Sequence, residues 1–268
     1  MFHSIYIPIQ LVVLLFSTQV LAYQSADDNW TDQNQRVVED FNAGDYDSAL
    51  VRAMELLKYA QDNPDPDRYN ISSSLNNLGM IHLKLGNYEE AEKAFKETLA
   101  IRIEEYGLSN TLVAVTTNNL GGVLQKEKKY SESEQYFRKS LRIKEENGDT
   151  SSESYAKTLD NIGTALMHQK KYAEAEGFLL KSFVLRKRLF GLDHPMIAVS
   201  YMNLASLRRY TNDYKDVESL YQNAHMIFKK NLGEYHPNTM LAFKNTVSFY
   251  RETQKSEDPV ALAKSLLQ

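Results

Sequence analysis

The 268-residue sequence contains no cysteine, which excludes disulfide bonds, thiolate metal sites and a cysteine nucleophile. It has no excess of positive charge either, because 31 Lys and Arg stand against 35 Asp and Glu, for a net charge of −4. A general nucleic-acid-binding domain is usually strongly basic, so nucleic acid is not the expected partner. The sequence also lacks a glycine-rich phosphate loop and a nucleophile elbow, and its histidines show no metal-ligand spacing. We therefore expect neither an enzyme nor a bound cofactor.

Long apolar runs are missing except at the N-terminus, where Ile5 to Phe16 resembles the core of a signal peptide. Val20-Leu21-Ala22 then offers the small or apolar residues expected before a cleavage site, so residues 1–22 are predicted to be removed on export. Export without cysteine favours a bacterial periplasm or outer surface. No Lys or Arg precedes the core, so an uncleaved membrane anchor is the alternative, although the core is short for a span of about 20 residues. No other stretch is long and apolar enough to span a membrane.

The remainder of the chain is built from one repeat. The stretch NNLGGVLQKEKKYSESEQYFRKSLRI, from Asn118 to Ile143, recurs in related form 42 residues upstream and 42 residues downstream. A fixed period in this range is typical of a solenoid, in which each unit packs mainly on its neighbours. One tyrosine position keeps the spacing without any insertion or deletion, at Tyr46, Tyr88, Tyr130, Tyr172 and Tyr214.

Each unit holds two amphipathic segments. In the third unit, helical spacing of apolar residues predicts a first helix from about Thr111 to Glu127 and a second from about Tyr130 to Asn147. The turn between them is short, which makes the two helices antiparallel neighbours. His194-Pro195 and His236-Pro237 are expected to cap and begin the next first helices. A small residue, expected to let the paired helix approach closely, recurs in the first helices at Gly79, Gly121, Gly163 and Ala205.

The ends of the array depart from the pattern, as ends that face water should. Gln35 stands at the repeated asparagine position in the first unit, and Ser256 replaces the tyrosine of the last. Asp258-Pro259 predicts a shortened final helix with an N-cap. The predicted organisation is a polar tether at 23–29 and an array at 30–268, with repeats at 30–71, 72–113, 114–155, 156–197 and 198–239 and a partial unit at 240–268.

The order of residues within the unit resembles the tetratricopeptide repeat, and the second unit carries the pattern at Leu78-Gly79, Tyr88, Ala91 and Phe95. The 42-residue length is similar to the longer variety found in kinesin light chains and in many bacterial proteins. The resemblance covers about residues 30–268. It implies an all-α fold, a right-handed superhelical solenoid of antiparallel helix pairs. It also implies a scaffold that binds peptides or proteins without catalysis of its own.

The resemblance further implies that the first helices line a concave groove. An asparagine recurs at one first-helix position, at Asn77, Asn119, Asn161, Asn203 and Asn245. A primary amide can both donate to and accept from a peptide unit, so a row of them would hold an extended segment by its backbone. Members of the family that clamp peptides use asparagine at this position. The alternative is that the amides join adjacent helices, and both roles can coexist.

Five other residues on or beside this face complete the predicted site, namely Lys126, Lys157, His168, Arg209 and Tyr210. Basic residues outnumber acidic ones along the expected groove, which favours an acidic partner or one with a free carboxylate. Ordinary solvated helix charge is the alternative. Met167 and Met202 would either help form an anchor pocket with Tyr210 or belong to the core. The competing function is a structural subunit of an envelope complex, assembled through its convex face or ends. Self-association is left open.

Overall fold

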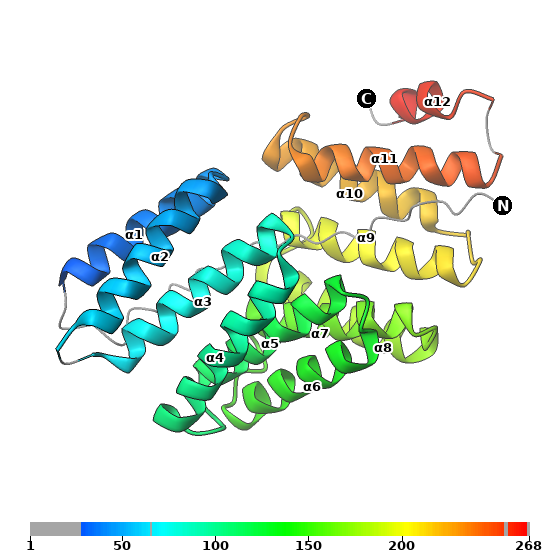
Figure 1. The fold of residues 1–268 in the computed structure, drawn as a ribbon. Coiled ribbons are helices and arrows are strands. Elements are labelled where there is room, and N and C mark those ends of the chain that lie inside the picture. The colour runs from blue at the N-terminus through cyan, green and yellow to red at the C-terminus, as the bar shows by residue number, and fades with distance from the viewer. Residues whose placement is uncertain (1–27, 65, 255–256, 267–268) are drawn as a thin grey trace. The chain divides into compact units, whose positions relative to one another are not determined.

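The computed structural model describes residues 28–64, 66–254 and 257–266. The predicted signal segment and most of the predicted tether, up to residue 27, lie outside these ranges. Within them the chain forms twelve α-helices and no strand (Figure 1). The predicted all-α architecture of helix pairs is confirmed. No helix in the described ranges is long and apolar enough to cross a membrane.

The chain divides into two compact units at Thr150 and Ser151. The N-terminal unit packs its six helices consecutively: α1 (Asp28–Ala43), α2 (Tyr46–Asp62), α3 (Arg68–Leu85), α4 (Tyr88–Tyr106), α5 (Thr111–Lys126) and α6 (Tyr130–Glu146). The C-terminal unit does the same with α7 (Glu153–His168), α8 (Tyr172–Phe190), α9 (Pro195–Tyr210), α10 (Val217–Leu232), α11 (Pro237–Glu252) and the short α12 (Pro259–Leu266). Odd-numbered helices are the first helices of the repeats, and even-numbered ones are the second.

Close packing of α3 on α4 and of α5 on α6 depends on the small first-helix residue. A Cβ atom added to Gly121 would lie 2.6 Å from the Phe137 ring, and one added to Gly79 would lie 2.7 Å from the Phe95 ring. Both phenylalanines are fully buried and come from the paired second helix. The predicted reason for glycine at this position, close approach of the paired helix, is confirmed.

Helix ends follow the sequence signals. The Nδ1 atoms of His194 and His236 accept hydrogen bonds from the backbone N–H groups two residues later, both at 3.2 Å. Asp258 caps α12 by accepting from the backbone N–H of Ala261, three residues later, at 3.0 Å. Each turn between paired helices contains one residue with positive φ at a single repeat position, occupied by Gly44, Gly86, Lys128, Lys170, Asn212 and Gln254.

The predicted repeat boundaries do not coincide with the helix pairs. Those at 72, 114, 156, 198 and 240 fall three or four residues inside first helices that begin at 68, 111, 153, 195 and 237. The predicted count started from Trp30, which is a buried core residue rather than a helix end. α1 begins at Asp28, so the last two residues of the predicted tether belong to this helix.

Candidate functional site

The asparagine row of the N-terminal unit joins first helices to one another. Asn77 Nδ2 donates to Asn34 Oδ1 at 2.6 Å, linking α3 to α1. Asn119 Nδ2 donates to Asn76 Oδ1 at 3.2 Å, linking α5 to α3. Neither Asn77 nor Asn119 makes another side-chain hydrogen bond within the described residues. Each amide therefore keeps its oxygen and one N–H for a ligand, which makes the bridging and binding roles compatible.

The row differs in the C-terminal unit. Asn203 and Asn245 are 6% and 7% exposed, and Asn161 is partly exposed on α7. In the N-terminal unit, each donating asparagine binds the residue 43 positions earlier in the chain. The residue at that spacing before Asn245 is Met202, whose thioether is a weak acceptor. Asn245 Nδ2 is buried and has no hydrogen-bond partner in the described part of the chain. A buried donor without an acceptor costs about 1–3 kcal/mol, so this position is a strong candidate for ligand contact.

The surface three residues beyond Asn119 is open. A Cβ atom added to Gly122 would meet nothing within 4 Å, unlike one added to its neighbour Gly121. The equivalent Ser206 is buried and donates to Met202 O at 2.7 Å. On the first-helix face of the N-terminal unit, Gly122 therefore leaves room beside the asparagine amide.

Lys84 and Lys126 occupy one repeat position on α3 and α5. Burial lowers the pKa of both lysines, and the charge of Lys126 lowers the pKa of Lys84 further. Lys84 Nζ lies 5.9 Å from the centroid of the Phe41 ring. Neither lysine has a salt-bridge partner among the described residues. An anionic group placed between them would relieve their repulsion.

Arg209 has a different environment from these lysines. Its side chain is 4% exposed, and its guanidinium binds Glu252 through Nε at 3.0 Å and through Nη2. Nη2 also donates to Ser248 at 3.3 Å, and Tyr214 donates to the second oxygen of Glu252 at 3.1 Å. Arg209 thus neutralises a carboxylate from α11 and holds that helix to α9.

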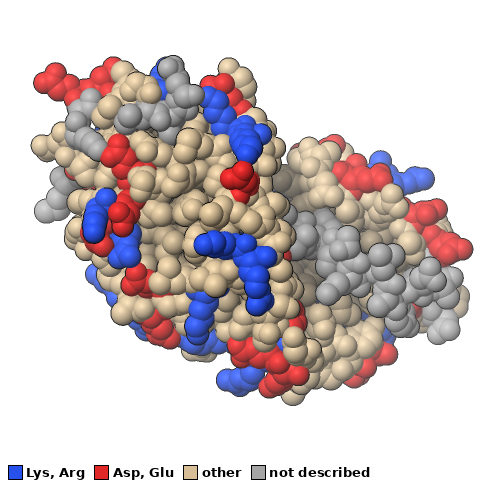
Figure 2. All heavy atoms as spheres, turned by 180° about the vertical axis from the view of Figure 1, so that it is seen from behind, with Lys and Arg blue, Asp and Glu red and all other residues tan. Residues whose placement is uncertain are grey.

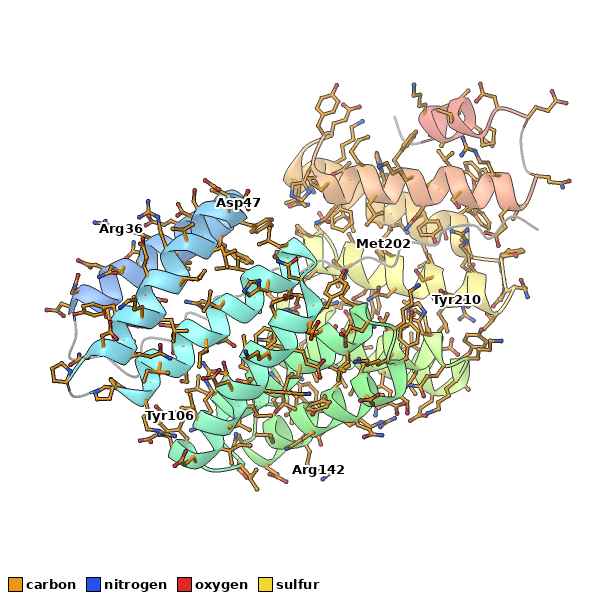
Figure 3. The ribbon with its side chains drawn as sticks, in the orientation of Figure 1. Arg36, Asp47, Tyr106, Arg142, Met202 and Tyr210 are labelled. Carbon is orange, nitrogen blue, oxygen red and sulfur yellow. The ribbon has the colours of Figure 1, made fainter. Side chains whose placement is uncertain are left out.

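Aromatic side chains gather at the ends of the first helices in the C-terminal unit. The Tyr210 ring lies 6.1 Å from His168, edge to face, and 6.1 Å from Tyr172, stacked. Burial lowers the pKa of His168, which favours its neutral form near pH 7. Figure 3 labels Tyr210 and Met202 along α9. Met202 and Met167 are 0% and 2% exposed, so both belong to the core and only Tyr210 presents a partly exposed ring.

A buried ion cluster in the C-terminal unit was not predicted. Arg186, 1% exposed, binds Asp160 through Nη1 and binds Glu153 through Nη2 at 2.9 Å. Burial raises the pKa of Glu153, while Arg186 and Lys157 oppose that rise. Asp160 is therefore part of this cluster. The 42-residue period could have revealed the cluster, because Arg102, Lys144 and Arg186 are buried cations at one repeat position.

Arg102 is the counterpart without a carboxylate. It is 3% exposed, and its Nη1 donates to Leu112 O at 3.2 Å and Thr116 Oγ1 at 2.7 Å, while Nε has no partner. Burial lowers the pKa of Arg102 to about 10. Tyr69 and Asn76 stand where Glu153 and Asp160 stand two repeats later, so neither carboxylate of the Arg186 cluster has a counterpart beside Arg102.

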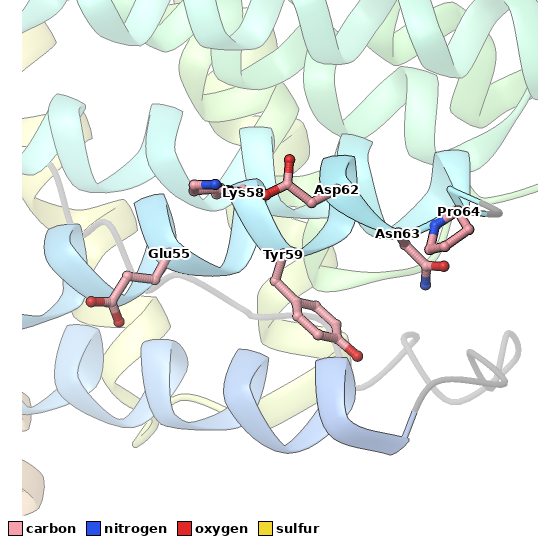
Figure 4. Close-up of a pocket in the computed structure, with 6 residues that line it drawn as sticks. All are labelled: Glu55, Lys58, Tyr59, Asp62, Asn63 and Pro64. Carbon is pink, nitrogen blue, oxygen red and sulfur yellow. Dashed lines mark hydrogen bonds and ion pairs between the residues drawn. The ribbon is translucent and has the colours of Figure 1, made fainter.

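Other surface features do not compete with the first-helix face. A hollow at the end of α2, shown in Figure 4, is lined by Glu55, Lys58, Tyr59, Asp62, Asn63 and Pro64. It belongs to a second helix, and two of its lining residues, Lys58 and Asp62, already pair with each other along that helix at 2.6 Å. Basic and acidic side chains are intermixed on the face drawn in Figure 2. Within the described ranges, no group of three or more His, Asp or Glu residues is placed to hold a metal ion.

Comparisons with solved structures concern the fold, because the identities are low. BtubC (BKLC) from P. vanneervenii is 20% identical, with a TM-score of 0.63 over 75% of this chain and 80% of that chain. The nearly identical TPR-like repeats of a Podosopora anserina putative kinesin light chain are 13% identical, with a TM-score of 0.61 over 75% and 96%. The Rap conjugation gene regulator of plasmid pLS20, in complex with the Phr* peptide, is 12% identical, with a TM-score of 0.69 over 89% and 62%.

Sequence comparison assigns the family. No curated protein matches this sequence. The tetratricopeptide repeat family, in contrast, matches residues 40–104, 70–146, 112–166 and 154–230, which together cover most of the chain. The kinesin-light-chain-like structures among the neighbours agree with the resemblance of the 42-residue repeat. The chain belongs to the tetratricopeptide repeat family.

Proposed function

We propose that this protein is an exported tetratricopeptide scaffold that binds an extended peptide or protein segment along its first helices, without catalysis. The observation that carries the proposal is the buried Asn245 Nδ2, which has no acceptor among the described residues. A peptide carbonyl would supply one. The free amide groups of Asn77 and Asn119 support the same role, as does the open surface at Gly122.

The chemistry of the partner follows from Lys84 and Lys126. Both lysines are half-buried, lie near one another and lack a carboxylate partner in the described ranges. An acidic side chain or a free carboxylate on the bound segment would offset their repulsion and speed its encounter with the face. A structural neighbour, the Rap regulator, was solved with the Phr* peptide, which supports a peptide as the ligand class. The apolar N-terminal segment supports export to a bacterial periplasm or surface.

The test uses synthetic, fluorescently labelled peptides selected from a random display library on the immobilised protein. Asn245→Leu is expected to weaken binding about tenfold or more, for a lost hydrogen bond of about 1.4 kcal/mol, while leaving the melting temperature unchanged or raised. Gly122→Leu should block binding by filling the open surface. Gly177→Leu is the matched control, because Gly177 is equally open but lies on the second helix α8. Full binding by both Asn245→Leu and Gly122→Leu, measured by anisotropy, would refute the proposal.

A second candidate is a structural subunit that assembles through its second helices. Val184 on α8 and Met226 on α10 occupy one repeat position and are 63% and 52% exposed. Apolar side chains this exposed suit a protein contact. In that case Val184→Ser with Met226→Ser would abolish assembly of the native complex, and Asn245→Leu would leave assembly intact.

A further inference from the structure

The last turn of the second helix α6 carries acidic residues, whereas the last turns of the second helices α8 and α10 carry basic ones. Glu145 and Glu146 end α6. The same two repeat positions carry Lys187 and Arg188 in α8 and Lys229 and Lys230 in α10. Lys187, Arg188 and Lys229 form no ion pair in the described part of the chain. The last turns of α8 and α10 are therefore basic, although the whole chain has a net charge of −4.

The same edge exposes large apolar side chains. Phe190 is 38% exposed, Leu192 is 47% exposed and Tyr235 is 87% exposed. Leu189 and Leu232 add two more exposed leucines. We call residues 187–192 and 229–235 the C-terminal loop edge. The corresponding positions after α6 hold Asn147, Gly148 and Thr150, so the combination of cations with exposed apolar groups is not a general property of the repeat.

The two segments of this edge are held side by side. Asn231 Nδ2 donates to Asp193 O at 2.9 Å, which ties the end of α10 to the loop between α8 and α9. Lys230 Nζ pairs with the carboxylate of the same aspartate at 2.8 Å. The Phe190 ring stacks on His194 with 4.3 Å between ring centroids. The two segments that carry the exposed rings and leucines therefore lie at adjoining helix ends.

We propose that the C-terminal loop edge docks on the surface of an anionic lipid bilayer. Aromatic rings and leucines favour the headgroup region, where one end of the side chain is apolar and the surroundings are wet. Lysine and arginine side chains around them pair with lipid phosphates. Apolar side chains at helix ends and in the loops that follow them, bordered by unpaired cations, fit a fluid surface, because a bilayer needs no matching contour. This surface is separate from the first-helix face, so the inference does not depend on peptide binding.

The experiment is flotation of the purified full chain with vesicles of phosphatidylcholine alone or mixed with phosphatidylglycerol. All variants carry the same N-terminus, so differences between them report the edge. Lys187→Glu with Arg188→Glu installs the residues found at Glu145 and Glu146. It should reduce binding to the anionic vesicles by at least about thirtyfold, because loss of two surface cations alone accounts for that factor and the two new carboxylates add repulsion. Phe190→Ser with Tyr235→Ser should reduce it about tenfold or more. High salt should weaken binding of the unmodified protein.

The control is Val51→Ser with Met54→Ser, because these residues are 57% and 58% exposed on α2 and should leave vesicle binding unchanged. Equal binding of the anionic vesicles by the unmodified and charge-reversed proteins would overturn the proposal. The proposal would also be overturned if the protein bound no vesicles but self-associated in sedimentation equilibrium, with an association that salt weakens and the charge reversal abolishes. That result would make a second copy of this chain, through its acidic helix ends, the partner instead.

Discussion

Arg186 in α8 and Asp160 in α7 form an ion pair buried inside the C-terminal unit, with side chains 1% and 7% exposed. Glu153 supplies a second carboxylate to the same guanidinium. Two repeats earlier, Arg102 is buried in the same way, but its hydrogen bonds to the described residues go to a carbonyl and a hydroxyl. The same repeat position therefore holds a cation paired with two carboxylates in α8 and a cation without a carboxylate among the described residues in α4.

This contrast predicts that the same substitution, Arg to Met, lowers the free energy of unfolding by different amounts at the two positions. Arg186→Met would leave two carboxylates buried without their partner, and should reduce the free energy of unfolding by about 3–5 kcal/mol. Arg102→Met removes a cation with no acid beside it, and Thr116 still donates to Leu112 O. Its cost should stay below about 1.5 kcal/mol. Urea denaturation followed by circular dichroism measures both, and equal losses would contradict the assignment of the ion cluster.

Two adjacent glycines on α5 predict opposite effects of one methyl group. Gly121→Ala would push a Cβ atom to within 2.6 Å of the Phe137 ring, and should destabilise the protein by about 1–3 kcal/mol through overpacking. Gly122→Ala adds the same atom in open space, and should stabilise the protein by about 0.5–1 kcal/mol through helix propensity. Thermal melting of the two variants compares them directly. A stabilising Gly121→Ala would mean that the helix pair is less tightly packed than the structure shows.

The sequence predicted the fold because its signals are local and repeated. The small residue at Gly121, the turn after α5 and the caps at His194 and His236 each act within one or two helices. A fixed 42-residue period then propagates them along the chain. The helix bounds of the third unit agree with prediction to within one residue. The first helices begin about one turn before the predicted repeat boundaries, because a periodic pattern gives the spacing of units but not where each helix begins.

The candidate site was less predictable, because its geometry depends on contacts between repeats. Helical spacing places Asn119 on a face, but it does not say which residue of α3 lies opposite that amide. The difference between Asn119, which finds Asn76, and Asn245, which finds no acceptor, depends on that cross-helix register. Likewise the charge of Arg209 is neutralised by Glu252 from the next first helix, a pairing that a count of groove charges cannot show.

The turn between paired helices offers a third prediction. Gly86 and Lys170 hold the same repeat position, with φ of 83° and 62°. A left-handed backbone costs a residue with a Cβ atom about 1–2 kcal/mol, partly offset by the greater chain entropy of glycine when unfolded. Lys170→Gly should therefore stabilise the protein by about 0.5–1 kcal/mol, and Gly86→Ala should destabilise it by about 1 kcal/mol. Denaturant midpoints report both, and a Lys170→Gly variant that melts earlier would contradict the strain at this turn.

The fourth prediction concerns pH. Burial lowers the pKa of four histidines below the ordinary value of 6.5, namely His82, His168, His194 and His225. In the pH range just below 6.5 the unfolded chain therefore binds more protons than the folded one. The stability that comes from keeping these histidines neutral in the folded state is complete above about pH 6.5. It is lost as the pH falls through their folded-state pKa values. We expect the melting temperature to be lower at pH 5.5 than at pH 7.5.

His194 provides the control for that experiment, because its neutral Nδ1 accepts the capping hydrogen bond from Met196 N. Protonation of this nitrogen would remove the bond, so the cap itself depends on pH. Asparagine also caps helices well, so His194→Asn should keep the stability at pH 7.5 and reduce the loss at pH 5.5. If the variant instead shows the same decrease in melting temperature as the unmodified protein, the titration of His194 does not contribute. His82, His168 and His225 must then account for the whole effect.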